Sequence, residues 1–279
     1  MKIGIIGLGL IGGSLALDWR SLGHTILGVS RRAETCEQAI ARGVVDDASP
    51  DLALMATAEV VVLCTPLGAM AATVAALLPH LQSGAILTDV GSVKQPIVEA
   101  IAPRWPHFVG GHPMAGTAES GLDAAQRHLF VDRPYILTPV TPTLPADVET
   151  VAELVRSLQA QLYFCQPTEH DRAVALISHL PVMVSASLIN ACLAEPDAAV
   201  LQLAQHLASS GFADTSRVGG GNPELGVMMA KYNQTALLHG LYQYRDRLDQ
   251  IIHQVETQDW AGLEALLHQT QQARPEFLK

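Results

Sequence analysis

Short apolar runs alternate with longer amphipathic stretches through the first 165 residues. The runs are rich in Val, Ile and Leu and are bounded by Gly, Pro or polar residues, so they predict β-strands. The predicted strands are residues 1–7, 24–30, 60–66, 85–91, 107–111, 134–139 and 161–165. Helical spacing of apolar residues occurs at 14–23, 33–43 and 70–81. Continuously apolar strands that alternate with helices predict an α/β fold, a doubly wound parallel sheet of the Rossmann type.

The pattern changes after about residue 167, and no convincing strand occurs from 168 to 274. Six apolar residues recur there at intervals of four and three: Leu237, Leu241, Tyr244, Leu248, Ile251 and Val255. Such a seam packs against another helix, either within the subunit or in a second subunit. Because a helical domain of ~110 residues often completes its core by pairing, we expect a homodimer formed through the C-terminal helices. We predict a Rossmann-type domain at residues 1–165 and an all-helical dimerisation domain at residues 166–279.

The apolar run at residues 3–17 could be mistaken for a signal peptide. Asp18 and Arg20 follow it directly, and no small-residue cleavage site comes after it. The run is also shorter than the ~20 apolar residues that a membrane span needs. We interpret it as a buried strand followed by the start of a helix, find no other credible span, and expect no membrane partner.

Charge and cysteine usage narrow the classes of function. The 279 residues include 27 acidic and 17 basic ones, for a net charge of −10. This balance disfavours nucleic acid and anionic membranes as main partners, although it leaves room for a local basic pocket. Hydrophobic residues make up 49% of the chain and charged residues 16%, which excludes a disordered chain. The four cysteines form no CxxC pair, so we expect neither disulfides nor a bound metal, and a cytoplasmic location.

A G-x-G-x-x-G motif follows the first predicted strand and opens a helix. It consists of Gly7, Leu8, Gly9, Leu10, Ile11 and Gly12. In a dinucleotide site, Gly7 would permit the tight turn, Gly9 would let the backbone approach a pyrophosphate, and Gly12 would let helix and strand pack closely. The free N–H groups of the helix would face the phosphates. The alternative is a glycine-rich packing turn without a ligand.

The end of the second predicted strand bears on the choice of dinucleotide. A site selective for NAD places Asp or Glu near this point to bind the ribose 2′-hydroxyl. This chain has Ser30, Arg31 and Arg32 there and no acidic residue before Glu34. Arginine binds phosphate bidentately and stacks on adenine, so we expect NADP rather than NAD. The alternative is a pair of solvated loop arginines.

Another segment should approach the cofactor. Cys64, Thr65 and Pro66 end the third apolar strand, and in doubly wound sheets ligands lie outside the carboxyl ends of strands. We therefore expect Thr65 and Pro66 to flank the cofactor ribose. Cys64 fits strand packing better than the role of a reactive thiol.

Two later segments, 88–94 and 110–117, should reach the same edge of the sheet. Of eleven histidines, His112 alone follows a strand and a Gly-Gly turn at that edge. An imidazole there can accept a hydroxyl proton while a hydride leaves the same carbon, so His112 is the candidate general base. Ser92 could hydrogen-bond to His112 or to the substrate, although a serine at a strand end is also commonly a helix cap.

Five segments together resemble one enzyme family. They are GLGLIGGSLA at 7–16, TDVGSVK at 88–94, GGHPMAGTAESG at 110–121, ISHLP at 177–181 and GFADTSRVGGGNPEL at 211–225. The chain resembles the prephenate/arogenate dehydrogenases of tyrosine biosynthesis across both predicted domains. With NADP expected and no fused mutase or regulatory domain, it looks closest to the NADP-dependent arogenate dehydrogenases of the cyanobacterial and plant type.

The resemblance implies a reaction and roles for particular residues. A hydride would pass from C4 of the cyclohexadienyl ring to the nicotinamide while the ring carboxylate leaves as CO2. His112 matches the family's catalytic histidine, which accepts the proton of the C4 hydroxyl, and Ser92 matches the serine that assists it. Arg217 matches the arginine that binds a substrate carboxylate, and Asp214 would either orient it or cap a helix.

Other residues match the family less closely. Thr117 and Lys94 fall near the expected substrate end. His179 is kept and would either contact substrate or tie helices together through Asp171. Many members follow HLP with a second histidine where this chain has Val182. Loss of a basic group there would suit the zwitterionic side chain of arogenate better than the anionic side chain of prephenate. The triple glycine at 219–221 and Gly226 also depart from the family pattern.

Three rival functions remain open at this point. The first is prephenate dehydrogenase. The second is a 3-hydroxyacid dehydrogenase or pyrroline-carboxylate-type reductase, which also joins a Rossmann domain to a helical one but lacks GGHPMAG. The third is a non-catalytic regulator that binds NADP without turnover.

Overall fold

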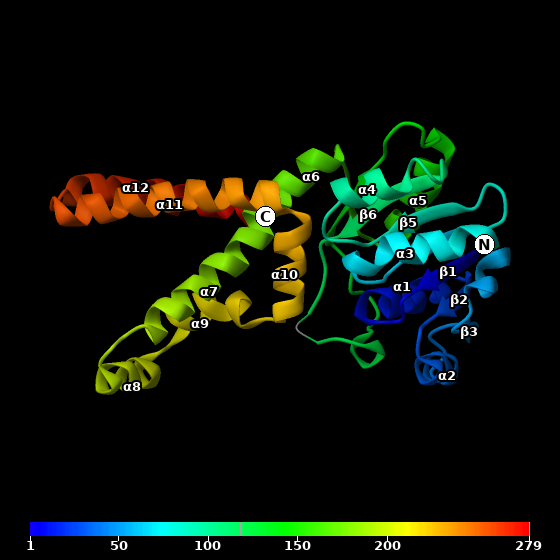
Figure 1. Ribbon diagram of the computed structural model, residues 1–279, viewed down its shortest axis with the longest axis horizontal. Helices are drawn as coiled ribbons and strands as arrows, with labels where there is room; N and C mark the ends of the chain where they lie inside the picture. The colour runs from blue at the N-terminus through cyan, green and yellow to red at the C-terminus, as the bar shows by residue number, and fades with distance from the viewer. Residues whose placement is uncertain (118, 279) are drawn as a thin grey trace. The chain divides into compact units, whose positions relative to one another are not determined.

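The computed structural model describes residues 1–117 and 119–278. The chain contains two compact units, Met1–Asn233 and Gln234–Lys279. The first unit holds the sheet and most of the helices, and the second is a pair of long helices (Figure 1). The boundary between the two compact units therefore differs from the predicted domain boundary at 165/166. That predicted boundary stays a prediction.

One sheet runs through the first unit. Among the described residues it has eight strands in the order β3-β2-β1-β4-β5-β6-β7-β8, and its first six strands have the Rossmann order. The strands are β1 (Lys2–Ile6), β2 (Thr25–Val29), β3 (Asp47–Ser49), β4 (Val60–Leu63), β5 (Ile86–Asp89), β6 (Phe108–Pro113), β7 (Pro134–Thr138) and β8 (Gln161–Phe164). The predicted fold class, a Rossmann-type sheet followed by helices, is confirmed.

Two details differ from the expected sheet. Strands β1 to β6 are parallel, but β7 pairs antiparallel with β6, and β8 then pairs parallel with β7. The β6–β7 connection contains only the short 3-10 turn Leu122–Ala124 and no crossover helix in its described residues, so β7 returns alongside β6. Strand β3 was not predicted, because three residues of sequence Asp-Ala-Ser carry no apolar run.

Helices cover both faces of the sheet (Figure 1). Alternate residues of each strand point to opposite faces, so Ile5 and Val62 enter one core while Val61 and Leu63 enter the other. The flanking helices are α1 (Leu10–Ser21), α2 (Ala33–Ala41), α3 (Leu67–Leu77), α4 (Gln95–Ile101) and α5 (Pro145–Ser157). Helices α1 and α5 contribute to the first core and α3 and α4 to the second, which fixes the carboxyl ends of the strands as a rigid edge.

The rest of the first unit is helical. It comprises α6 (Pro167–Val174), a π-helical turn (Ala175–His179), α7 (Leu180–Leu193), α8 (Ala198–Leu207), α9 (Ser210–Ser216), a 3-10 turn (Arg217–Gly220) and α10 (Pro223–Tyr232). Ser185 is the only buried residue of α7 in the described chain. Large apolar residues such as Leu176, Leu193 and Leu203 are exposed instead. These helices thus leave much apolar surface uncovered in one subunit.

One continuous helical stretch, Pro167–Leu193, is long and apolar enough to cross a membrane by length and composition alone. Such a segment was not predicted, since no credible span was expected in the chain. The stretch carries buried polar side chains at His170, Asp171 and His179. One such helix is weak evidence for a membrane span, because the core helix of a soluble protein can pass the same test.

The second unit consists of α11 (Gln234–Glu256) and α12 (Trp260–Ala273), followed by a short 3-10 turn (Arg274–Phe277). Asp259 caps α12 by accepting a hydrogen bond of 2.9 Å from the backbone N–H of Gly262. Three members of the predicted apolar seam, Tyr244, Leu248 and Val255, are more than 40% exposed in this chain. Leu237, at the start of the seam, is buried, so only part of the seam is covered within one subunit.

Candidate active site

The turn from β1 to α1 has the shape that the glycine motif predicts. Gly7 has a φ of +107°, in the region that side chains rarely adopt, and a Cβ there would lie 2.5 Å from the carbonyl oxygen of Cys64. A Cβ on Gly12 would lie 2.0 Å from the carbonyl oxygen of Gly7. Both positions therefore require glycine for the turn and for the close packing of α1 on β1.

The remaining motif residues differ from these two. A Cβ on Gly9 would meet nothing within 4 Å, so the turn is open at this point. Gly9 is also the N-cap of α1, and no side chain caps that helix. Leu8 is buried, whereas Leu10 and Ile11 are half-buried. Open space next to uncapped N–H groups is the arrangement that receives a phosphate.

Ser30, Arg31 and Arg32 follow β2 on the surface. Ser30 is half-buried, and the two arginines are exposed and form no ion pair or hydrogen bond through their side chains in the described chain. Glu34 lies further on, in the first turn of α2. We call the Gly7–Gly12 turn together with Ser30–Arg32 the cofactor edge.

Cys64, Thr65 and Pro66 follow β4 beside this edge. The hydroxyl of Thr65 is buried and has no hydrogen-bond partner among the described residues, so it is free to bond to a ligand. Burial raises the pKa of the Cys64 thiol strongly, and the nearby Asp89 adds to the effect. Cys64 therefore stays a neutral thiol and packs rather than reacts.

His112 lies near the end of β6, opposite Ile136 of β7. Its side chain is buried, with 7% of the residue exposed. Its Nδ1 lies 2.8 Å from Nε2 of His170, while its own Nε2 forms no hydrogen bond with another described residue. Burial, followed by the charges of His170, Lys94 and His179, lowers the pKa of His112 well below 6.5. The imidazole is neutral at pH 7, as a proton acceptor must be.

His170 and Asp171 form the next links behind His112. His170 Nδ1 lies 2.8 Å from Asp171 Oδ1. The Asp171 carboxylate also accepts the backbone N–H groups of Lys94 at 2.6 Å and Gln95 at 2.8 Å, at the start of α4. Sequence reasoning missed His170, because it is 58 residues from His112 and shows no local spacing to it.

Lys94 has a position different from the predicted one. It is fully buried, and its ammonium group donates hydrogen bonds to Asp89 Oδ2 and, at 2.6 Å, to the carbonyl oxygen of Gly111. Asp89 Oδ1 accepts the N–H of Gly111 at 3.1 Å. Lys94 thus holds the residue before His112 instead of facing a ligand. We call Asp89, Lys94, His112, His170 and Asp171 the His112 network.

The other predicted substrate residues are spread over several segments. Ser92 is half-buried and makes no hydrogen bond to His112 in the described chain, so the first of its two predicted partners is not found here. Thr117 and Arg217 are exposed, and the Arg217 side chain forms no hydrogen bond or ion pair with another described residue. The structure does not bring Arg217 into contact with His112.

His179 lies in the π-helical turn and is fully buried. Its Nδ1 is 3.2 Å from Nδ2 of Asn233, which also donates to the backbone carbonyl of Asp171 at 2.7 Å. Burial lowers the pKa of His179 to about 4. In this structure His179 ties helices together near Asp171, while its Nε2 is buried without a partner among the described residues.

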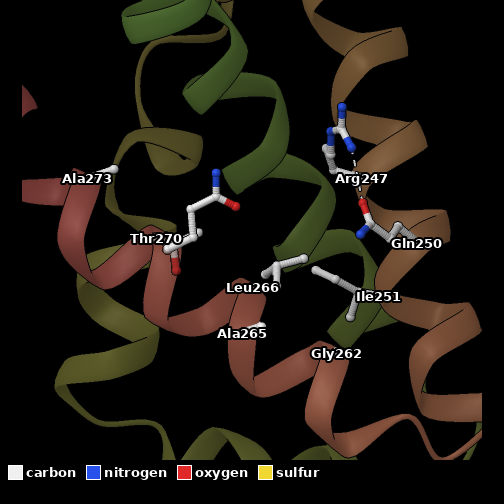
Figure 2. Close-up of a pocket in the computed structure, with 9 residues that line it drawn as sticks. Arg247, Gln250, Ile251, Gly262, Ala265, Leu266, Thr270 and Ala273 are labelled. Carbon is white, nitrogen blue, oxygen red and sulfur yellow. Dashed lines mark hydrogen bonds between the residues drawn. The ribbon is translucent and has the colours of Figure 1, made fainter.

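A separate pocket of about 740 Å³ lies within the second unit, between α11 and α12. Arg247 donates a hydrogen bond of 3.1 Å to Gln250, and Ile251 and Leu266 line the pocket beside them (Figure 2). Its lining contains no histidine, cysteine or carboxylate, so it offers no acid–base chemistry. The His112 network, in contrast, contains the histidines, lysine and carboxylates that acid–base chemistry requires.

Comparison with known proteins covers nearly the whole chain. The nucleotide-binding domain of prephenate dehydrogenase matches residues 15–164, and the dimerization domain of prephenate dehydrogenase matches residues 166–269. Prephenate dehydrogenase from Bacillus subtilis strain 168 is 33% identical over 269 residues, which cover 93% of this chain and 71% of that protein.

Two solved structures extend the comparison. The arogenate dehydrogenase of Synechocystis is 53% identical, with a TM-score of 0.91 over 99% of this chain and 100% of that one. Prephenate dehydrogenase from A. aeolicus, solved with hydroxyphenyl propionate and NAD+, is 24% identical and has a TM-score of 0.93 over 99% and 98% of the two chains. The second similarity shows a shared fold.

Proposed function

The chain belongs to the prephenate dehydrogenase family, and from this membership we propose that it oxidises L-arogenate to L-tyrosine and CO2 with NADP+ as the acceptor. The observation that carries the choice of arogenate is the full-length similarity to the Synechocystis enzyme. Replacement of a second histidine by Val182 fits this choice, because it removes a group that would favour an anionic side chain.

The cofactor edge supports a dinucleotide. Gly9 leaves room for the pyrophosphate, and the uncapped start of α1 supplies N–H donors to it. Ser30 and Arg31 would bind a 2′-phosphate, and no carboxylate occurs at the end of β2 to repel it. The orphan hydroxyl of Thr65 would bond to the ribose, beside Pro66. When bound, the nicotinamide supplies the hydride acceptor for ring carbon C4.

His112 supports the proton-transfer half of the reaction. Its neutral imidazole presents Nε2 to the site, so it would accept the proton of the C4 hydroxyl. Ser92, half-buried and not bonded to His112, would hydrogen-bond to the same hydroxyl. Loss of CO2 then makes the ring aromatic, which drives the reaction to completion.

Arg217 would bind a substrate carboxylate and Thr117 would lie beside it. A bidentate guanidinium is well suited to fixing a dianionic ring, and Arg217 has no competing partner in the described chain. We assign Lys94 a supporting role through Asp89 and Gly111, and His179 a role in joining helices beside the substrate.

We also propose a homodimer. Residues 166–269 match a dimerization domain, and three residues of the α11 seam, Tyr244, Leu248 and Val255, are more than 40% exposed in one subunit. We retain residues 1–165 and 166–279 as the functional domains. The four free cysteines support a cytoplasmic location.

Prephenate is the second candidate substrate, because the Bacillus subtilis relative is a prephenate dehydrogenase. The test is the initial rate of nicotinamide reduction with arogenate, prephenate and 3-hydroxyisobutyrate, each with NADP+ and with NAD+. We expect the highest kcat/KM for arogenate with NADP+. Preference for prephenate would overturn the substrate assignment alone. Turnover of the hydroxyacid and of neither dienyl acid would overturn the reaction.

A further inference from the structure

The candidate base and two side chains behind it form one hydrogen-bonded line. His112 Nδ1 lies 2.8 Å from His170 Nε2, and His170 Nδ1 lies 2.8 Å from Asp171 Oδ1. The two rings meet edge to face, with centroids 5.0 Å apart. All three residues are buried, so each nitrogen in the line must be satisfied by its neighbour.

The direction of the hydrogen bonds follows from Asp171. A carboxylate only accepts, so His170 Nδ1 carries a proton and donates it to Oδ1. A neutral imidazole carries a single N–H, and in His170 that N–H is on Nδ1. His170 Nε2 is then a bare acceptor, and His112 Nδ1 donates to it. The bare nitrogen of His112 is therefore Nε2.

Asp171 is itself held in place from three directions. Its two oxygens accept the N–H groups of Lys94 and Gln95, which fixes the carboxylate against the start of α4. Its backbone carbonyl accepts Nδ2 of Asn233 at 2.7 Å. A π-helical turn begins four residues later, at Ala175, and such turns are common at functional sites. These contacts hold Asp171 in place, so that it can set the orientation of the His112 ring through His170.

We propose that His170 and Asp171 are positioning residues that hold His112 as the Nδ1–H tautomer, with the Nε2 lone pair facing the substrate. The proposal rests on the proposed function and assigns to these residues a part in its proton transfer. The C4 hydroxyl proton moves to His112 Nε2, and the Nδ1 proton remains on His112 and donates to His170. The carboxylate of Asp171, reached through the neutral His170, stabilises the imidazolium that results.

A second histidine–aspartate pair provides a matched control. His107 Nδ1 lies 2.8 Å from Asp147 Oδ2, but this pair joins α5 to the start of β6 and forms no hydrogen bond with another histidine among the described residues. The His107 side chain is 25% exposed and that of His170 only 1%, so the control reports the loss of a His–Asp contact away from His112 rather than an identical structural cost. Only the His170 pair should affect catalysis and the tautomer of His112.

The first experiment is 15N NMR of the full-length, ligand-free protein labelled at histidine, at pH 7.5, with the signals of His112 identified by their loss in His112→Gln. We expect His112 to be protonated at Nδ1 and bare at Nε2, and His170→Leu to remove this preference. A wild-type His112 that is protonated at Nε2 overturns the proposal. Because this spectrum needs no turnover, failure of the proposed reaction would not obscure the result.

The second experiment is steady-state kinetics with arogenate and NADP+. We expect His170→Leu to lower kcat by about 10- to 100-fold, part of the ~10²–10⁴-fold that a general base contributes, with the KM for NADP+ within about twofold of wild type. His170→Gln, whose amide oxygen can accept from His112 Nδ1, should recover most of the rate. His107→Leu should leave kcat unchanged.

Two outcomes of the kinetics would overturn the proposal. One is a folded His170→Leu with a kcat within threefold of wild type, and the other is a His170→Gln as slow as His170→Leu. If His170→Leu does not fold, the wild-type spectrum and His170→Gln decide the matter.

Discussion

The cofactor edge and the His112 network lie at the same end of the sheet, yet they are built in opposite ways. The cofactor edge is open: Gly9 faces empty space, α1 has no side-chain cap, and Arg31 has no partner in the described chain. The His112 network is closed, with Lys94 and His170 bonded on both sides. The open edge has room and unpaired donors for a ligand. The closed network instead orients one of the protein's own groups, the imidazole of His112.

A methyl group added at a packed glycine should lower stability, whereas one added at the open glycine of the cofactor edge should weaken cofactor binding. We expect Gly12→Ala to destabilise the protein by about 1–3 kcal/mol, because its Cβ would lie 2.0 Å from the Gly7 carbonyl oxygen. Gly9→Ala should unfold at the wild-type temperature but bind NADP+ at least about tenfold more weakly, because its Cβ enters the space for the pyrophosphate. Thermal unfolding and NADP+ titration measure both effects. Equal unfolding temperatures for Gly12→Ala and Gly9→Ala would contradict the distinction between a packing glycine at 12 and a ligand-facing glycine at 9.

The next prediction concerns the choice of cofactor. Combined Ser30→Asp and Arg31→Gln should weaken NADP+ binding by about 10- to 100-fold, the loss of one or two charge-assisted hydrogen bonds, and leave NAD+ within about threefold. Arg42→Gln is the control, since Arg42 is also exposed near the end of α2 but pairs with Asp123 at 2.6 Å. Isothermal titration with both nucleotides gives the ratio. An unchanged preference would contradict the proposed 2′-phosphate site.

A smaller effect is expected from pH. Burial and the neighbouring His170, Lys94 and His179 lower the pKa of His112 below 6.5, so the neutral base persists under mildly acidic conditions. The kcat/KM for arogenate should therefore stay constant from pH 8 to pH 6.5 and decline only below that range. An acid limb centred at or above 6.5 would show that the base is not held in the closed network described here.

The two regions also differ in how well sequence alone predicted them. The glycine turn is local: an apolar strand, three spaced glycines and a helix start are all within twelve residues, so their geometry could be stated in advance. The central strands were predicted for the same reason, because buried parallel strands read as continuous apolar runs. The polar three-residue strand β3 offered no such run.

The parts of the site and the sheet that were not predicted depend on contacts between residues far apart in the sequence. His170 and Asp171 lie within the polar helix α6, and nothing in that stretch indicates that the His170 side chain reaches His112 of β6. The burial of Lys94 was missed for a related reason, because its carboxylate partner and its carbonyl partner come from two different strands. The reversal at β7 depends on the path of the chain after His112, which local spacing does not specify.

In the proposed reaction His112 takes the substrate proton, and a separate set of residues, the cofactor edge, holds the cofactor. The most direct measurement is the kcat of His112→Gln with arogenate and NADP+, beside the Kd of the same variant for NADP+. We predict that kcat falls by about 10²–10⁴-fold and that the Kd stays within about twofold of wild type. A kcat within threefold of wild type, with cofactor binding intact, would contradict the account.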